Sequence, residues 1–320
     1  MRRPGLVATS LIIVLCCCNW GFFAHKKINR LAVFTLPAEV SVFYKRNIRF
    51  VEEAAVNPDR RRYAVPEEAA RHFIDLDAYG DSALHLPKYW NDAISKMGID
   101  SLKAHGILPW HINRVYHELK NAFFVKDPDR ILRLSADLGH YIADAHVPLH
   151  TTRNYDGQLT GQTGIHAFWE SRLPELFSQE FDFFTGKAVY IDDVQGTAWK
   201  IVGYTNLALD SVLQIEKALS RKWGDKKYNF ESQGRQTVKV VSANYANAYH
   251  QMLAGMVERQ MRAAVLLTGS IWYTAWVDGG QPDMKMLADY KPTEEDIAKR
   301  EAELKKWAEE KKLAVRPHEN

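Results

Sequence analysis

Hydrophobic residues recur with helical spacing along most of the chain and predict a series of amphipathic helices. The expected helices cover residues 38–56, 66–76, 87–98, 109–124 and 127–147. The first should stop near Pro58, and a proline stands at or near the start of each of the other four, where it suits the first helical turn because its missing N–H has no partner there. Pro148 should end or kink the last of them, since proline cannot continue the helical ladder.

Two longer apolar stripes occur in the second half of the chain. The first contains Ile201, Tyr204, Ala208, Val212, Ile215 and Leu219, and the second contains Val241, Tyr245, Tyr249, Met252 and Met256. Both are typical of core-facing helices, and Gly269 is the expected end of the second. No alternating series typical of strands and no internal repeat is visible. The pattern predicts an all-α fold with one domain over residues 20–290, followed by a charged helix or tail over residues 291–320.

The first residues have the features of a secretion signal. Arg2 and Arg3 precede an apolar stretch over residues 6–18, which is too short to span a bilayer as a stable helix. We expect residues 1–19 to be removed and the mature protein to be exported to the periplasm or the extracellular space, with no transmembrane anchor. The alternative is that this stretch is retained as an N-terminal membrane anchor.

Net charge gives little information about binding partners, and the cysteine content argues against disulfides in the mature chain. The formal net charge is +3, and removing the two leader arginines from 42 basic residues leaves 40 against 39 acidic ones. This balance gives no general argument for nucleic acid or an anionic membrane as partner, and no stable protein partner is evident. All three cysteines, Cys16 to Cys18, lie in the leader. A mature chain without disulfides needs another source of stability, and a metal is one candidate.

The run "HYIADAHVPLH" places three metal-capable side chains close together. His140 and Asp144 are four residues apart, so they share one helix face, and His150 follows the turn at Pro148. One interpretation is a metal site, and the other is a capped helix end exposed to solvent. His146 points away from the Asp144 face, so we interpret it as structural.

A second pair, His166 and Glu170, also has a spacing of four and comes after a Gly/Thr-rich loop over residues 151–165. Such a pair alone is often a surface contact. Together with His150 it makes three ligands and leaves a position open for water, which is the pattern of a catalytic zinc site.

Four further residues can be interpreted either as ordinary structural residues or as functional ones. Asp59 comes after Asn-Pro and can be a turn residue, and His72 can be a buried histidine with satisfied hydrogen bonds. Trp20 and His25 stand where the leader should be cut. Cleavage before Trp20 would free an α-amine, which is a good nitrogen ligand when neutral.

In this order, the segments resemble the superfamily of zinc-dependent phospholipases C and single-strand-specific nucleases, which are all-α phosphodiesterases with three zinc ions. The resemblance covers about half of the chain and implies a ligand set for each ion. One zinc would be held by Asp59, His72, His140 and Asp144, the second by Asp144, His25 and the terminal amine and carbonyl of Trp20, and the third by His150, His166 and Glu170.

The implied reaction is hydrolysis of a phosphate ester by zinc-activated water. Asp59 could orient that water as a catalytic residue. Phe73 could stack on a base or line an acyl groove, and Asp75 could support a ligating histidine, although a core phenylalanine and a surface charge are the ordinary alternatives. The arginines at 60, 61, 62 and 153 could meet phosphate or form a solvated face.

Our first choice is an exported zinc-dependent phosphodiester hydrolase of the phospholipase C type, acting on phospholipid. Glu170 in the "G-x-H-x-x-x-E" form favours the phospholipases, whereas the short spacing from Trp20 to His25 resembles the nucleases. One alternative is a single-strand-specific nuclease or 3′-nucleotidase that uses the same zinc ions on single-stranded nucleic acid. Another is a non-catalytic binding protein stabilised by zinc.

Overall fold

Helices build almost all of the computed structural model, which describes residues 22–233 and 236–310. The first half contains α1 (Phe22–Ala32), η1 (Val33–Thr35), α2 (Ala38–Arg46), α3 (Ile48–Ala54), α4 (Asn57–Arg61), η2 (Ala69–Arg71), η3 (Leu76–Ala78), η4 (Gly80–His85), α5 (Trp90–Met97), α6 (Ile99–His105), α7 (Leu108–Phe124), α8 (Pro128–Asp144) and η5 (Pro148–Thr151). The second half contains α9 (Ile165–Ala167), the π-helix η6 (Phe168–Arg172), α10 (Leu173–Phe177), α11 (Val194–Leu207), α12 (Leu209–Trp223), η7 (Gly224–Lys227), β1 (Tyr228–Gln233), β2 (Gln236–Val241), α13 (Ala243–Met252), α14 (Met256–Asp278), α15 (Met284–Ala288) and α16 (Glu294–Glu309). The all-α prediction is confirmed.

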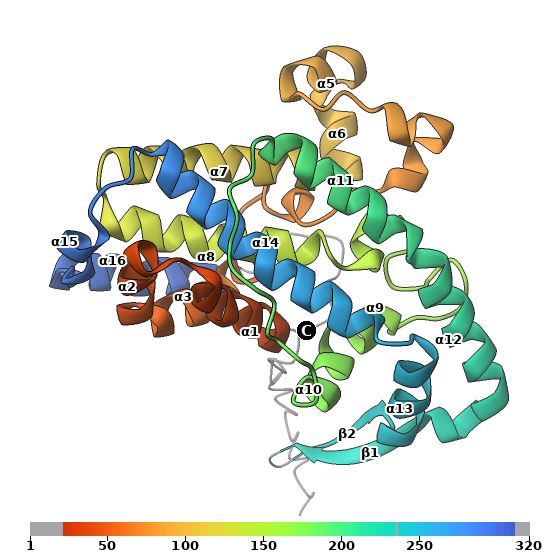
Figure 1. Ribbon diagram of the computed structural model, residues 1–320. Helices are drawn as coiled ribbons and strands as arrows, with labels where there is room; N and C mark the ends of the chain where they lie inside the picture. The colour runs from red at the N-terminus through yellow and green to blue at the C-terminus, as the bar shows by residue number, and fades with distance from the viewer. Residues whose placement is uncertain (1–21, 234–235, 311–320) are drawn as a thin grey trace, which may run out of the picture.

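Four helices form the framework that carries the candidate site. The helices α7 and α8 lie side by side, and both α1 and α14 pack against α8, as Figure 1 shows. Hydrophobic side chains form one cluster around Tyr44, Phe123 and Trp272, and a second around Phe168 and Tyr245. The end of α8 contributes to both clusters, which places its last turn deep in the protein.

The start and end of α8 reflect local signals in the sequence. The Asp127 side chain accepts a hydrogen bond of 3.0 Å from the Arg130 amide, and Pro128 occupies the first turn. The helix ends at Asp144, slightly before the expected end near residue 147, and Pro148 begins the short helix η5. This early end turns the chain so that His150 can approach the same point as Asp144.

The predicted helix over residues 66–76 was wrong. Only Ala69–Arg71 forms a helical turn there, and the chain then continues without regular secondary structure up to η3. The amide of Ile74 donates to the His150 carbonyl at 2.9 Å, and the amide of Asp75 donates to the His105 carbonyl at 2.8 Å. These long-range bonds replace the helical ladder and hold the segment that carries His72.

Three other predicted helices are each divided in two, and the one that carries the second stripe falls on α13 and α14. The segment 38–56 forms α2 and α3, because Asn47 adopts φ −108° and ψ 17° between them. The stripe over residues 201–219 falls on α11 and α12, which meet at Ala208, and Tyr204 in this stripe is exposed. An apolar stripe across a helix junction therefore does not mean one continuous buried face.

A β-hairpin also departs from the sequence-based prediction, which contained no strands. Strands β1 and β2 pair antiparallel with Tyr228 opposite Val241. Val241 therefore ends a strand and does not begin the second helical stripe. Helix α13 starts two residues later, where the Ser242 side chain accepts a hydrogen bond from the Tyr245 amide.

Gly269 does not end a helix as predicted, but lies inside α14 at a close contact with η1. A Cβ atom built on Gly269 would lie 1.9 Å from Thr35 Oγ1 and 3.1 Å from the Ala32 carbonyl oxygen. The glycine is therefore needed for close packing, and its low helix propensity is a cost of about 1 kcal/mol that this packing offsets.

We expect Gly269→Ala to lower the free energy of unfolding by about 1–3 kcal/mol, because the added methyl group overpacks the contact with Thr35. Gly203→Ala in α11 is the matched control, since its Cβ would meet no atom within 4 Å and alanine favours the helix. Urea unfolding of the two variants measures both effects. Equal stability of the two variants would show that α14 and η1 do not pack this closely.

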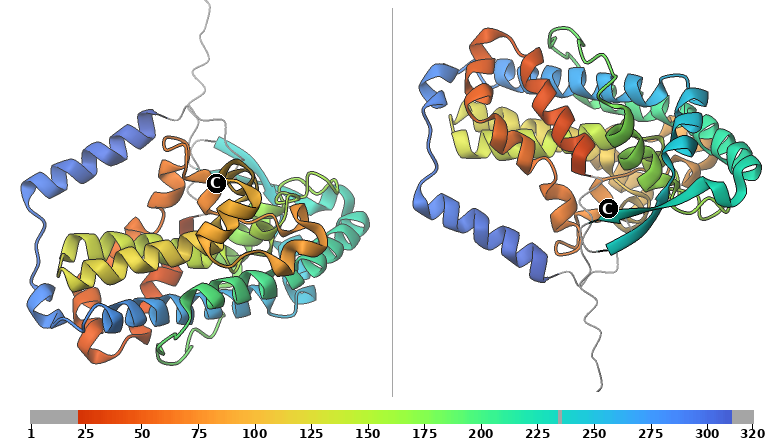
Figure 2. Two further views of the ribbon diagram at one scale, coloured as in Figure 1. Left: turned by 90° about the horizontal axis from the view of Figure 1, so that it is seen from above. Right: turned by 90° about the horizontal axis from the view of Figure 1, so that it is seen from below.

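The charged segment near the C-terminus forms α16, which starts with a capping box between Thr293 and Asp296. Figure 2 shows α16 at the outer edge of the helical body. Residues 1–21 and 311–320 lie outside the described part of the chain, so the predicted leader, Trp20 and the end of the tail stay predictions. In the described part, no helix combines the length and apolar character needed to cross a membrane.

Candidate metal centre

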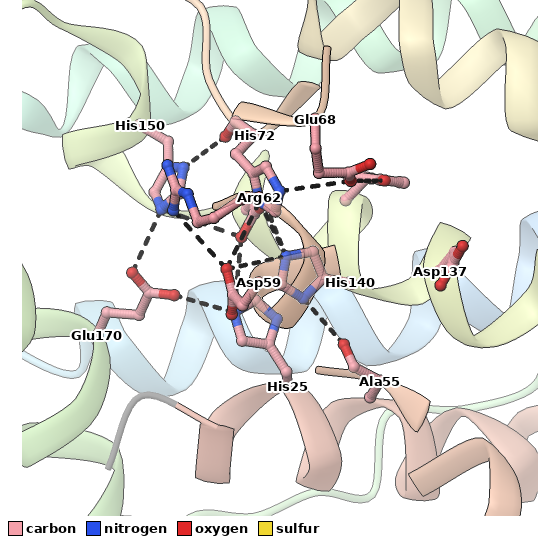
Figure 3. A network of polar contacts seen from close by, with 12 residues as sticks. His25, Ala55, Asp59, Arg62, Glu68, His72, Asp137, His140, His150 and Glu170 are labelled. Atoms are coloured by element: carbon pink, nitrogen blue, oxygen red, sulfur yellow. Dashed lines mark hydrogen bonds and ion pairs between the residues drawn. The ribbon is translucent and has the colours of Figure 1, made fainter. Parts of the chain in front are cut away.

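Eight of the nine residues predicted as ligands meet in one buried cluster, and the ninth, Trp20, lies outside the described residues. The eight side chains are His25, Asp59, His72, His140, Asp144, His150, His166 and Glu170. They come from α1, α4, the segment after η2, α8, η5, α9 and η6. Figure 3 shows most of them pointing toward a common centre. Segments far apart in the sequence thus meet at the last turn of α8.

Asp144 lies at the middle of the cluster. Its Oδ2 atom is 3.0 Å from His72 Nδ1 and 3.3 Å from His140 Nε2. Its Oδ1 atom is 3.5 Å from His25 Nε2 and 3.9 Å from His150 Nε2. The two carboxylate oxygens therefore face two different sets of imidazoles, which is the arrangement that a bridging carboxylate needs.

Asp59 completes the group on the Oδ2 side. Its Oδ1 atom lies 3.7 Å from His72 Nδ1 and 3.6 Å from His140 Nε2, and the two ring nitrogens are 3.0 Å apart. Pro58 in the first turn of α4 fixes the backbone beside Asp59, so the carboxylate is held by a short helix and not by an ordinary turn.

Glu170 belongs to the group on the opposite side. Its Oε2 atom is 2.8 Å from His166 Nε2 and 3.3 Å from His150 Nε2, and these two nitrogens are 3.2 Å apart. Its Oε1 atom lies 3.0 Å from His25 Nε2. Glu170 sits in the π-helix η6, a local widening that is common at functional sites.

The distances between donor atoms fit metal ions. In a tetrahedral zinc site with bonds of about 2.0–2.1 Å to nitrogen and oxygen, neighbouring ligand atoms are roughly 3.3 Å apart. The separations around Asp144, Asp59 and Glu170 run from 2.8 to 3.9 Å. The donor atoms form three groups: His25, His140 and Asp144; Asp59, His72 and His140; and His150, His166 and Glu170. Each of these groups can hold a metal ion.

In three of the histidines, the ring nitrogen that faces away from the centre has a backbone partner that orients the ring. His140 Nδ1 lies 2.9 Å from the Ala55 carbonyl oxygen, and His166 Nδ1 lies 3.1 Å from the Tyr155 carbonyl oxygen. His150 Nδ1 lies 2.5 Å from the His72 carbonyl oxygen. A backbone acceptor at one ring nitrogen leaves the other unprotonated and able to ligate, as is usual in metal sites.

The electrostatics of the cluster also favour a cation. Burial lowers the pKa of His25, but the hydrogen bond to Glu170 and the charges of Asp144 and Glu170 outweigh burial and raise the pKa to about 9. Burial raises the pKa of Asp144, and the charges of His140 and His150 reverse this and hold the pKa well below its usual range. Buried carboxylates need compensating positive charge, which protons or metal ions can supply.

Glu68, which was not among the residues predicted from the sequence, supports His72 from behind. Glu68 is fully buried, and its Oε1 atom lies 3.6 Å from His72 Nε2. It accepts hydrogen bonds from Arg61 Nε at 2.8 Å, from Arg71 Nη1 at 2.6 Å and from the Tyr141 hydroxyl. A glutamate seven residues after an arginine gives no sequence signal, because this contact depends on the irregular chain that replaces the predicted helix at residues 66–76.

The run of three arginines after Asp59 is not a uniformly solvated face. Arg62 is only 1% exposed, and its Nη1 atom lies 3.8 Å from Asp59 Oδ1. Arg61 is mostly buried, and its Nη2 atom lies 2.9 Å from Asp137 Oδ2. Arg153 remains largely exposed beside Asp77. Arg62 is therefore the guanidinium that lies at the centre, as Figure 3 shows.

The two predicted substrate contacts, Phe73 and Asp75, are 6% and 5% exposed. A Cβ atom on Gly106 would lie 2.1 Å from the Phe73 carbonyl oxygen, so this segment packs closely against the start of α7. Their contact with substrate stays a prediction. His146 is buried outside the three metal groups, with Nδ1 2.7 Å from the Ile142 carbonyl oxygen.

The loop before α9 is anchored so that His166 points inward. The carboxylate of Asp156 accepts hydrogen bonds from the amides of Gly164 at 2.9 Å and His166 at 3.3 Å. Gln162 Nε2 donates to Glu216 Oε2 at 2.5 Å and so fastens the loop to α12. These bonds explain how a Gly-rich segment can position a ligand.

Comparison with known proteins finds a match among solved structures. No protein-family model matches the sequence, and no curated protein matches it. Among solved structures, the chain is similar to the alpha toxin from Clostridium absonum, with 13% sequence identity and a TM-score of 0.47. The match covers 79% of this chain, and the chain spans 65% of the length of the toxin.

Proposed function

We propose that this protein is an exported, zinc-dependent phosphodiester hydrolase of the phospholipase C type. The observation that carries the proposal is the convergence of three buried ligand groups around Asp144 and Glu170, each with donor atoms at distances that suit a metal ion. The donor sets contain only imidazole nitrogens and carboxylate oxygens, which zinc accepts. A periplasmic or extracellular location is implied by the predicted leader and belongs to the same proposal.

The proposed ligand sets divide the cluster among three zinc ions. The first would be held by Asp59, His72, His140 and Asp144; the second by Asp144 and His25, together with the amine and carbonyl of Trp20; and the third by His150, His166 and Glu170. The contact of 3.0 Å between His25 and Glu170 supports the closeness of the second and third sets. Trp20 completes this scheme only if the mature chain begins there.

Bound zinc supplies Lewis-acid chemistry, since it lowers the pKa of water and neutralises charge on phosphoryl oxygens. The chain itself supplies positioning. Arg62 is buried with Nη1 3.8 Å from Asp59 Oδ1 and would add a permanent positive charge beside the proposed ligands. Asp59 would orient the attacking water by accepting a hydrogen bond from it. The protein thus needs no side-chain nucleophile.

The second candidate is a single-strand-specific nuclease or 3′-nucleotidase, which would use the same ligands. Tyr155 is the observation that favours it, because its half-buried ring lies 6.4 Å from the His166 ring and can offer a stacking surface for a base. Phe73 is buried and serves this role less well. A phospholipid substrate remains our choice because of the Glu170 motif.

A side-by-side assay separates these functions. Purified, zinc-loaded protein is given a phosphatidylcholine or phosphatidylethanolamine dispersion, single-stranded DNA, RNA and bis(p-nitrophenyl) phosphate. We expect release of phosphorylated head group from lipid and hydrolysis of the small diester, with nucleic acid uncut. If nucleic acid is cut and lipid is untouched, the nuclease replaces our choice, and Tyr155→Ala should then lower nucleic acid cleavage by roughly tenfold. If the protein binds zinc but hydrolyses none of these esters, the result would favour the non-catalytic zinc-binding protein.

A further inference from the structure

A cavity lies between α16 and the outer surfaces of α3, α4 and α8. Its volume is about 480 Å³, which is within the usual range for small-molecule sites. Five arginines line it: Arg60, Arg61, Arg130, Arg133 and Arg300. None of the residues that line this cavity belongs to the metal groups. The cavity is therefore a separate site, and its ligand can be inferred independently of the proposed hydrolase activity.

The cavity carries an excess of positive charge. Five arginines face three carboxylates, Glu53, Asp137 and Glu303, which leaves a lining charge of 5 − 3 = +2. The ion-pair partners just outside the lining do not change this sum. Lys26 and Arg71 add two positive charges, and Glu68 and Asp129 add two negative charges.

Two of the arginines account for this excess. In the described part of the chain, Arg60 and Arg130 have no ion pair with a carboxylate, and Arg60 donates only to Asn57 Oδ1 at 3.3 Å. By contrast, Arg133 and Arg300 share Asp129, and Arg61 lies between Glu68 and Asp137. Arg60 and Arg130 are therefore available to bind an anion.

An apolar surface lies beside these charges. Phe50, Leu134 and Trp307 line the same cavity. The guanidinium of Arg300 lies 4.5 Å from the centre of the Phe50 ring, and that of Arg61 lies 5.9 Å from the Trp307 ring. A ligand that fills the cavity must therefore combine an anionic group with an apolar or aromatic part.

We propose that this cavity binds an organic phosphate monoester. A phosphate monoester carries a charge of about −1.5 to −2 at pH 7, which matches the +2 of the lining, whereas a phosphodiester carries only one negative charge. Guanidinium groups bind phosphate oxygens through paired hydrogen bonds. The apolar or aromatic part of the ligand packs against Phe50, Leu134 and Trp307. A soluble nucleoside monophosphate and a lipid with a phosphate monoester head group share this chemistry.

The cavity lies behind the metal centre and is separated from it by a layer of polar residues. Arg61, in the cavity wall, binds Glu68 at 2.8 Å, and Glu68 faces His72. Figure 3 shows Glu68 and Asp137 on the side of His140 that faces away from His150 and Glu170. A ligand in the cavity therefore cannot touch the residues that would hold zinc. Mutations of the cavity arginines should change its affinity, whereas mutations of the proposed zinc ligands should not.

Isothermal titration calorimetry of the full protein tests this site with four probes: adenosine 5′-monophosphate, monomeric dihexanoyl phosphatidic acid, inorganic phosphate and adenosine. We expect at least one of the two monoesters to bind with one molecule per chain. Tighter binding of adenosine 5′-monophosphate would indicate a soluble ligand, and tighter binding of phosphatidic acid would indicate a lipid. Inorganic phosphate should bind at least about tenfold more weakly, because it leaves the apolar wall uncovered. Adenosine should not bind, because it brings no charge to the arginines.

The decisive comparison is between arginine variants. The double variant Arg60→Gln/Arg130→Gln should lower the affinity by at least about tenfold, and each single variant should lower it by less. Arg153→Gln is the matched control, because it makes the same change in an exposed arginine outside the cavity. Circular dichroism and the melting temperature check that each variant is folded. The proposal is wrong if neither monoester binds, if the double variant binds like the parent, or if Arg153→Gln weakens binding equally.

Discussion

Asp144→Asn should lower the hydrolase activity by at least about a hundredfold and reduce the zinc content of the purified protein. Asp144 lies at the middle of the cluster, with one carboxylate oxygen 3.0 Å from His72 Nδ1 and the other 3.5 Å from His25 Nε2. Losing a residue that only supports a ligand already costs about 10–100-fold, and loss of a shared ligand should cost more. The measurements are kcat/KM on a small phosphodiester and zinc per chain by mass spectrometry.

Two control variants separate this effect from general damage to α8. Asp129→Asn makes the same chemical change in the first turn of the helix, far from the cluster. His146→Gln alters the nearest histidine that is outside the metal groups, where burial lowers the pKa to about 4 and keeps the ring neutral. Both variants should retain most of the activity and zinc. A loss in His146→Gln as large as that in Asp144→Asn would refute the assignment of helix faces.

Much of the candidate site could be predicted because its parts are local. The spacing of His140 and Asp144 places both on one face of α8, and the structure confirms that this helix starts at Asp127-Pro128 and ends before Pro148. Neither signal depends on distant residues. The spacing of four between His166 and Glu170 likewise predicts that the two side chains lie together, and they do so even though Glu170 lies in a π-helix.

The contacts that join the separate segments could not be predicted from the sequence. His25 and Glu170 are 145 residues apart and meet only because α1 and η6 pack together. Glu68 and Arg62 carry no pattern that distinguishes them from surface charges, and their burial results from the irregular chain between α4 and η3. There, bonds to His150 and His105 outweigh local helix propensity.

The wrong predictions about the fold have related causes. The hairpin of β1 and β2 is short, and the alternation between apolar and polar residues in each strand covers only a few positions, such as Val238-Lys239-Val240. So short a run is a weak signal for a strand. In the sequence, Gly269 looks like the end of a helix. Its actual role is to allow a close contact with Thr35, which lies far away in the sequence, so the local pattern does not reveal it. Sequence periodicity thus identifies helices well but gives little information about close contacts between them.

Removal of zinc should abolish hydrolysis and lower the melting temperature by roughly 10 °C. A ligand at a thousandfold excess over its Kd stabilises a protein by about 4 kcal/mol, and 1 kcal/mol shifts the melting temperature of a chain of this size by about 2–4 °C. All three cysteines lie at positions 16–18, so the described part of the chain has no disulfide to replace this stabilisation. Calorimetry with and without a chelator measures the shift, and addition of zinc should restore both properties. Stripped protein with full activity would refute the zinc mechanism.

The difference between zinc-loaded and stripped protein should widen as the pH rises from 6.5 to 9. In the stripped protein, the pKa of His25 is raised from 6.5 to about 9, mainly through Glu170 and Asp144 acting against burial. A raised folded pKa means that this contribution to stability is complete below pH 6.5 and is lost as the pH rises through 9. Zinc binding requires the neutral imidazole, so zinc affinity increases over the same range as the proton leaves. Melting curves of both forms at pH 6.5, 7.5 and 9 test this. A difference that narrows with pH would show that His25 is not a zinc ligand, even if chelation still abolishes activity.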